Sequence, residues 1–262
     1  MVAWSASFDV AARLRAAGCV FADDEARLLR EAAASPAELT RLVERRVAGE
    51  PLEYIVGWVE FCGLRVAVEP GVFVPRRRTE LLARQAATVA QAGDVVVDLC
   101  CGSGAVGAAV LAAVPGVELH SVDLDPVAVR CARRNVGDRV YLGDLYEPMP
   151  PRLRGRVAVL VANGPYVPTA ALATMPPEAR LHEPTVALDG GTDGLDVLRR
   201  VIAGAADWLA RRGSVLVESS QAQARLLVSD MTSAGLEPRV VRDDETGSTV
   251  VIGVKRASGR RA

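Results

Sequence analysis

The spacing of hydrophobic residues divides the chain into a helical part and an alternating part. In residues 1–57, apolar side chains recur every three or four positions, which is typical of amphipathic helices. The segment Ser35-Pro36-Ala37-Glu38 gives the clearest helix start, because a capping serine precedes a proline at the first helical position. Between Trp58 and Val74, apolar and polar residues alternate, which predicts a β-hairpin. We expect short helices before this hairpin, over residues 10–16, 24–33 and 36–48.

Strand-like and helix-like segments alternate after a predicted helix over residues 79–90. Short apolar segments predict strands, over residues 95–99, 117–122, 140–142, 157–162, 215–218, 239–241 and 249–254. Helical spacing predicts helices, over residues 105–114, 126–135, 195–210 and 222–234, with an irregular stretch over 163–194. This order predicts an α/β fold with a doubly wound, seven-stranded, mostly parallel sheet of the Rossmann-like kind. The turn at residues 243–247 makes the last two strands antiparallel.

These patterns give the expected domain organisation. Residues 1–57 are expected to form a small helical domain, and residues 58–75 a hairpin that bridges to the next part. Residues 76–256 are expected to form the α/β domain. The polar tail, residues 257–262, is expected to be disordered.

Composition and charge narrow the class of protein. Acidic and basic residues nearly cancel at a net charge of −1, whereas nucleic-acid-binding domains usually carry a basic excess. The 5 cysteines lack CxxC spacing and the 2 histidines pair with none of them, so we expect neither a metal site nor a disulfide framework. Free cysteines are typical of the cytoplasm. No apolar stretch is long enough to predict a membrane span.

Candidate cofactor chemistry follows three predicted strands. The first runs into Asp98-Leu99-Cys100-Cys101-Gly102-Ser103-Gly104, where glycines let the backbone approach a ligand closely. This turn lacks the GxGxxG spacing of dinucleotide-binding enzymes. Asp123 ends the second strand, where a carboxylate can accept ribose hydroxyls, although helix capping is an alternative that better fits Asp125. Asp144 and Leu145 follow the third strand and suit an adenine. The pattern predicts S-adenosylmethionine, bound by Asp98, Cys100, Cys101, Gly102, Ser103, Gly104, Asp123, Asp144, Leu145 and Asn163.

A second motif, Asn163-Gly164-Pro165-Tyr166, ends the fourth predicted strand. Because of this motif and several other matching segments, the chain resembles the HemK/PrmC-type protein glutamine methyltransferases over about residues 46–254. The other matching segments are residues 49–57, 61–64, 74–80, 183–184, 187–191 and 193–195. The resemblance implies a class I methyltransferase fold, S-adenosylmethionine, and transfer of a methyl group to the N5 amide nitrogen of a protein glutamine. It implies a peptide-chain release factor as the partner, and an N-terminal domain that helps to grip it.

The resemblance assigns catalysis to Asn163 and Tyr166, and acceptor binding to Asn163, Gly164, Pro165 and Tyr166. An amide nitrogen is a weak nucleophile, so we expect oxygen acceptors to hold its N–H groups while Tyr166 packs on the amide. The chain departs from the family pattern at two positions. Gly164 stands where the family has proline, and Cys100 where it usually has glycine. These differences indicate a divergent branch.

Two other functions remain open from the sequence. Asn-Pro-Pro-Tyr motifs also occur in amino methyltransferases of the adenine-N6 type that act on DNA or RNA, but those enzymes lack the Asp-Gly-Gly block at residues 189–191. The chain could also bind the cofactor without turnover, with Gly164 as the defect. The run Arg76-Arg77-Arg78 is compatible with an anion or RNA site, and equally with a solvated helix start.

Overall fold

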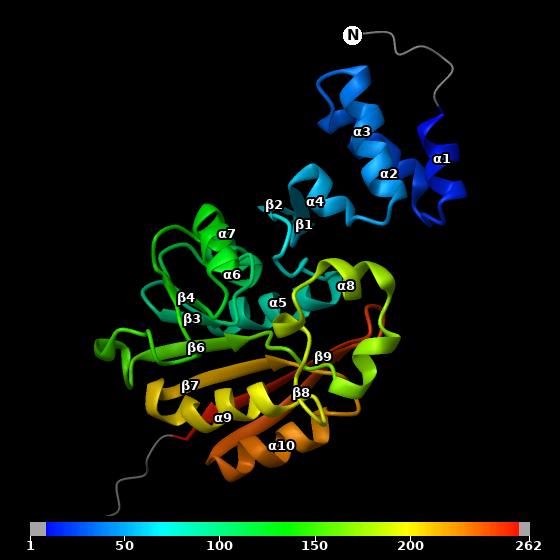
Figure 1. Ribbon diagram of the computed structural model, residues 1–262. Coiled ribbons are helices and arrows are strands. Elements are labelled where there is room, and N and C mark those ends of the chain that lie inside the picture. Colours follow the sequence, from blue (N-terminus) through cyan, green and yellow to red (C-terminus); the bar gives the residue numbers. More distant parts are fainter. Residues whose placement is uncertain (1–8, 257–262) are drawn as a thin grey trace, which may run out of the picture.

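The computed structural model describes residues 9–256 and has a seven-stranded sheet with helices on both faces (Figure 1). The strands are β3 (Val95–Leu99), β4 (Glu118–Asp123), β5 (Val140–Leu142), β6 (Val157–Ala162), β7 (Leu209–Glu218), β8 (Leu236–Asp243) and β9 (Ser248–Lys255). They lie in the order β5-β4-β3-β6-β7-β9-β8. Neighbours from β5 to β7 are parallel, and β9 is antiparallel to β7 and β8. The predicted fold class, including its antiparallel final pair, is confirmed.

Alternate residues of each central strand face opposite layers of the core. In β3, Val95, Val97 and Leu99 join the core on one face, and Val96 joins the core on the other. The first core is covered by α9 (Asp196–Trp208) and α10 (Ala224–Ser233). The opposite face is covered by α5 (Glu80–Val89), α6 (Ala105–Ala113) and α7 (Pro126–Val136) (Figure 1). Both faces of β3 are therefore buried, as its wholly apolar start predicts.

The N-terminal helices share a core of their own. They are α1 (Val10–Ala16), α2 (Ala22–Ala32), α3 (Pro36–Val47) and α4 (Leu52–Val56). Val10, Leu14 and Leu29 are fully buried within this group. Ser35 caps α3 as expected, since its side chain accepts a hydrogen bond from the Glu38 N–H. The group is set apart from the sheet in Figure 1.

A short hairpin joins the helical group to the sheet. It consists of β1 (Trp58–Phe61) and β2 (Leu64–Ala67), so its paired part ends earlier than the alternation to Val74 predicts. Asn135 of α7 attaches β2 to the α/β part. Its Oδ1 accepts from the Ala67 N–H and its Nδ2 donates to the Ala67 carbonyl, each at 2.9 Å.

Several element boundaries differ from the predictions. The helix predicted over 195–210 ends at Trp208, and β7 begins at Leu209 instead of Val215. The start of this strand was not predicted because Arg211 and Arg212 interrupt the apolar pattern. The strand pairs irregularly with β6, and Arg212 has a φ of 64°. β8 extends through Pro238, which an edge strand tolerates.

The stretch expected to be irregular contains short helical segments. They are α8 (Pro177–His182) and the 3-10 turns Thr169–Thr174 and Thr185–Ala187; two further 3-10 turns are Arg77–Thr79 and Pro151–Leu153. None of the helices within residues 9–256 is long and apolar enough to cross a membrane. The tail predicted to be disordered, residues 257–262, lies outside the described residues.

Candidate active site

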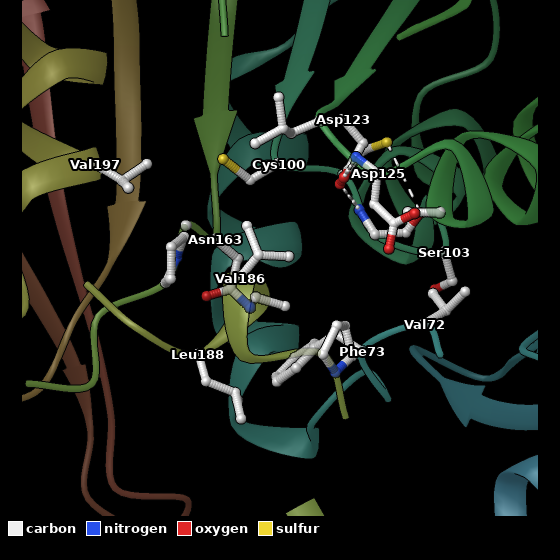
Figure 2. Close-up of a pocket in the computed structure, with 18 of the residues that line it drawn as sticks. Val72, Phe73, Cys100, Ser103, Asp123, Asp125, Asn163, Val186, Leu188 and Val197 are labelled. Atoms are coloured by element: carbon white, nitrogen blue, oxygen red, sulfur yellow. Dashed lines mark hydrogen bonds between the residues drawn. The ribbon is translucent and has the colours of Figure 1, made fainter. Parts of the chain in front are cut away.

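A cavity lies at the carboxyl ends of β3, β4, β5 and β6 (Figure 2). The strand order reverses between β3 and β6, which is where α/β sheets of this kind bind ligands. Its wall contains Asp98, Cys100, Cys101, Gly102, Ser103, Asp123, Asp144, Leu145, Asn163, Gly164, Pro165 and Tyr166. The structure therefore brings together the residues that the sequence placed at four separate strand ends. Gly104 is the exception. A Cβ there would lie 3.3 Å from side-chain carbons of Ala132 and Val136, so this glycine allows α6 to pack on α7.

The turn after β3 is held by Asp123. Asp123 Oδ2 accepts a hydrogen bond from the Gly102 N–H at 2.8 Å, and its Oδ1 accepts from the Asp125 N–H at 2.9 Å (Figure 2). Gly102 has a φ of 54°, in the left-handed region that favours glycine. The cap of α7 is Asp125, whose side chain accepts from the Val127 N–H at 2.7 Å. Asp123 is therefore not the helix cap.

Asp98 is a buried carboxyl group beneath this turn. Its Oδ2 accepts from the Gly107 N–H at 3.0 Å, and its exposed fraction is 2%. Burial raises the pKa of Asp98 to about 7, the Gly107 hydrogen bond opposes the rise, and the charge of Asp123 adds to it. The carboxyl group therefore keeps its proton to a higher pH than an ordinary aspartate does.

The third strand end presents one polar and one apolar side chain to the cavity. The Asp144 carboxylate pairs with Arg200 of α9 at 2.6 Å, and Leu145 is buried with a φ of 48°. Arg200 lines the same cavity and was missed from the sequence, because nothing in its local pattern connects α9 with β5. Ser103 adds a buried hydroxyl that has no hydrogen-bond partner among residues 9–256.

Asn163 projects from the end of β6 with one side of its amide already engaged. Its Nδ2 donates to Thr79 Oγ1 at 3.3 Å, and Thr79 is 2% exposed. This contact orients the amide so that Oδ1, which accepts no hydrogen bond from the described residues, remains available in the cavity (Figure 2). Sequence reasoning missed Thr79, which lies 84 positions away from its partner.

Gly164 is tightly enclosed on the side where a side chain would point. A Cβ there would lie 3.2 Å from Leu198 Cδ2, 3.4 Å from Val197 Cγ1 and 3.7 Å from Cys100 Sγ. The two positions that depart from the family pattern, Cys100 and Gly164, are therefore neighbours in space. Only the Leu198 contact is tighter than ordinary van der Waals packing, so a side chain at 164 would require Leu198 to shift by a few tenths of an ångström.

The Asp-Gly-Gly block holds the loop that follows Asn163. The Val167 N–H donates to the Leu188 carbonyl at 3.0 Å, and the Gly190 N–H donates to the Val167 carbonyl at 2.9 Å. Gly190 is required by this close approach, because a Cβ there would lie 2.7 Å from the Pro165 carbonyl oxygen. The Asp-Gly-Gly block, which the sequence indicated only through the family resemblance, thus supports the loop over residues 164–168, which we call the acceptor loop.

An apolar wall closes the cavity opposite the strand ends. It includes Phe73, Val186 and Leu188 (Figure 2). Phe73 lies between the buried residues Val72 and Val74 and is itself only partly buried, so burial alternates along this segment. That alternation was the available signal for Phe73, which the sequence prediction did not include.

Arg76 fixes the segment that carries Phe73. Its guanidinium donates to both carboxylate oxygens of Glu183 at 2.6 Å, and Glu183 also accepts from the Val74 N–H at 3.2 Å. Burial raises the pKa of Glu183, while the Arg76 charge opposes the rise. Arg76 is therefore committed to an internal ion pair and does not form an open anion site.

Comparisons with known proteins agree with this geometry. Residues 63–175 match the Methyltransferase small domain family. The release factor glutamine methyltransferase of Geobacter sulfurreducens is 37% identical over 217 residues, which cover 81% of this chain and 75% of that protein. The 4-amino-L-phenylalanine/4-methylamino-L-phenylalanine methyltransferase of Streptomyces pristinaespiralis is 37% identical over 198 residues, covering 72% and 67%.

A solved structure supports the fold alone. The Pyrococcus furiosus methyltransferase has a TM-score of 0.56 and 16% identity, covering 74% of this chain and 90% of that one. Further relatives named release factor glutamine methyltransferase are 32% to 42% identical to this chain. The sequence matches and the cavity at the strand ends place the chain in the release factor glutamine methyltransferase family.

Proposed function

We propose that this protein transfers a methyl group from S-adenosylmethionine to the N5 amide nitrogen of a glutamine in a peptide-chain release factor. The observation that carries the proposal is the Asn163 amide, whose Nδ2 is held by Thr79 while Oδ1 faces the cavity. An oxygen in that position can accept an N–H of a substrate amide. The family membership supports the same acceptor. We expect the protein to act in the cytoplasm, where translation takes place.

The residues at the first three strand ends fit the proposed cofactor. The turn from Cys100 to Ser103 offers a close backbone approach, and Asp123 keeps unused lone pairs for ribose hydroxyls. Ser103 supplies a buried hydroxyl that lacks a partner among the described residues. Asp144 and Leu145 form the wall expected beside an adenine, with Asp144 steadied by Arg200. When bound, S-adenosylmethionine supplies an electrophilic methyl group on its sulfonium.

The acceptor end of the cavity is proposed to orient a planar amide. Asn163 Oδ1 and the Gly164 carbonyl would accept the two N–H groups, and the rings of Tyr166 and Phe73 line the same space. Orientation alone can lower the barrier substantially, because a fixed geometry removes the entropy cost of alignment. On transfer the methylated nitrogen would release one N–H proton to solvent, with the neutral thioether as the leaving group, so no side chain is assigned as a general base.

The N-terminal helices are proposed to grip the protein substrate. Arg46 of α3 donates to Glu25 of α2 at 2.6 Å and lies 3.3 Å from Glu178 of α8, so the helical group is tied to a helix near the cavity. Met175 and Pro184, on either side of α8, line the cavity itself. A protein that docks on the helical group can therefore extend a loop into the site.

A second acceptor class is favoured by one observation. The Streptomyces pristinaespiralis relative, named for an aromatic amine substrate, is as similar in identity as the Geobacter protein. A free aromatic amine also presents N–H groups on a planar frame, which the same residues could hold. This candidate enters the test as a direct competitor.

The test compares three acceptors with methyl-labelled S-adenosylmethionine. Purified release factor, 4-amino-L-phenylalanine and double-stranded DNA are each incubated with the protein at equal cofactor concentration. We expect label on the release factor, and at most trace label on the other two. Label on the aromatic amine supports the second candidate, label on DNA contradicts both, and cofactor binding without transfer to any acceptor indicates loss of catalysis.

A further inference from the structure

We propose that Glu218 and Gln223, at the junction of β7 and α10, are positioning residues that hold Tyr166 at the acceptor end of the cavity. Neither residue lines the cavity, so each acts through Tyr166 and not on a substrate directly. The inference rests on the proposed methyl transfer, because it concerns how the acceptor end is kept in shape. Sequence reasoning included neither residue.

Glu218 fixes the phenol of Tyr166. The Tyr166 hydroxyl donates to Glu218 Oε1 at 2.9 Å, and Glu218 is the last residue of β7, with an exposed fraction of 2%. Its other oxygen, Oε2, is buried without a hydrogen-bond partner in the described part of the chain. A buried carboxylate is costly unless donors or nearby positive charge compensate it, so the Tyr166 hydroxyl and the Arg78 guanidinium beside Oε1 are important.

Arg78 supplies positive charge beside Oε1, and it contacts both members of this pair. Its Nε lies 3.4 Å from Glu218 Oε1, and its guanidinium carbon lies 5.7 Å from the centre of the Tyr166 ring. A guanidinium over an aromatic face is attractive. The phenol is therefore held at its hydroxyl by a strand end and at its face by the segment before α5.

Gln223 fixes the main chain at Tyr166. Its Nε2 donates to the Tyr166 carbonyl at 2.9 Å and to the Asp193 carbonyl at 3.0 Å. Its Oε1 accepts from the N–H and the hydroxyl of Ser220, at 3.1 Å and 2.7 Å. Both ends of the amide are engaged, so its orientation is determined. This one side chain therefore joins the loop at Tyr166 to the segment at Asp193.

Gly194 makes this connection possible. A Cβ at that position would lie 2.3 Å from the Tyr166 carbonyl oxygen and 2.5 Å from Gln223 Nε2, so only glycine leaves room for the hydrogen bond. Tyr166 is thus held at its hydroxyl by Glu218 and at its backbone by Gln223, and both residues lie at the junction of β7 and α10. Displacement of an acceptor group by about 1 Å can lower a rate by roughly 100-fold.

The first test replaces Gln223 with glutamate and uses Gln221→Glu as the matched control. Gln223→Glu keeps the size but replaces the amide nitrogen, which donates to two carbonyls, with a carboxylate oxygen that faces them. Gln221 is exposed in the same turn. We expect kcat to fall roughly 10- to 100-fold in Gln223→Glu, with the dissociation constant of S-adenosylmethionine unchanged. Hydrogen exchange at residues 163–168 and 189–195 should accelerate. Gln221→Glu should stay within about twofold of the wild type.

The second test compares Glu218→Gln with Glu218→Leu. Glutamine retains an oxygen for the Tyr166 hydroxyl, so it should restore most of the kcat that leucine removes. Equal kcat in these two variants, or no difference between Gln223→Glu and Gln221→Glu, would overturn the positioning role. A parallel loss of cofactor affinity and kcat in Gln223→Glu would also overturn it, since that pattern indicates general destabilisation.

The kinetic measurements use whichever acceptor takes up label with the wild-type protein. If the release factor takes none but another acceptor does, the proposed function fails while the positioning role is still measured on that acceptor. If no acceptor is labelled, hydrogen exchange decides. Faster exchange in Gln223→Glu alone supports the hold on the loop, and unchanged exchange contradicts it.

Discussion

In the proposed reaction, Asn163 is the residue on which the acceptor chemistry depends most directly. Its amide combines an engaged donor with an available acceptor, and both are needed for orientation. Asn163→Ala removes both, so transfer should fall about 100-fold or more while S-adenosylmethionine binding is retained. Thr79→Val, which removes only the partner of Nδ2, should cause a smaller loss. Turnover and equilibrium cofactor binding measure the two effects, and undiminished transfer by Asn163→Ala would show that the strand end is wrongly assigned.

The buried carboxyl group of Asp98 makes the unfolding free energy depend on pH. The native carboxyl keeps its proton up to about pH 7, whereas an unfolded chain releases it near pH 4. Between these values the native state binds more protons than the unfolded state, so the contribution of Asp98 to stability falls as the pH rises. Asp98→Asn cannot ionise, and its stability relative to the wild type should therefore increase from pH 4 to pH 7, by up to about 1.4 kcal/mol per pH unit. Urea unfolding of the cofactor-free protein across this range checks the slope, and a constant difference would contradict it.

At the scale of elements, the loop after β6 and the segment over residues 188–194, which contains the Asp-Gly-Gly block, act as one unit. The loop gains its shape from backbone hydrogen bonds to the block and from close approaches at Gly190 and Gly194. Short connections of this kind are rigid only if no side chain separates the two backbones. The glycines of the block are therefore explained by packing against the acceptor loop.

Two glycines with similar backbone angles provide a controlled test of this packing. Gly194 has a φ of 80° and would place a Cβ 2.3 Å from the Tyr166 carbonyl oxygen, whereas Gly235 has a φ of 75° and no atom within 4 Å of such a Cβ. Gly235→Ala should cost roughly 1 kcal/mol of unfolding free energy, from backbone strain alone. Gly194→Ala should cost about 2 kcal/mol more and slow transfer as well. Equal losses in urea unfolding would show that the close approach is unimportant.

The placement of the site residues together at the strand ends could be predicted from the sequence, but their hydrogen-bond and ion-pair partners could not. Asp98, Asp123 and Asn163 follow apolar strands, and parallel strands bring their carboxyl ends together. Thr79, Arg200 and Glu218 contact residues of the site from positions 52 to 84 residues away in the sequence. Such contacts depend on how the layers pack, which local hydrophobic spacing does not encode. The early start of β7 was missed for a local reason, because Arg211 and Arg212 interrupt its apolar pattern.

At the scale of the whole molecule, Arg46 joins the N-terminal helical group to α8, the helix beside the cavity. Its side chain and that of Glu25 are 12% and 11% exposed, so removal of the guanidinium leaves a buried carboxylate unpaired. Arg46→Met should therefore lower the unfolding free energy by about 3 kcal/mol. Arg45→Met is the control, since Arg45 pairs with Glu50 at the surface and should cost less than about 1 kcal/mol. Similar losses in the two variants would contradict a structural role for the buried pair.

The central claim is the identity of the methyl acceptor, and mass spectrometry tests it most directly. Release factor incubated with this protein and S-adenosylmethionine is digested, and each peptide is fragmented to locate the added methyl group; Asn163→Ala serves as the inactive control. The account predicts one methyl group on the side-chain amide of a single glutamine, absent from the control reaction. A methyl group on any other residue type, or an equal signal with Asn163→Ala, would contradict it.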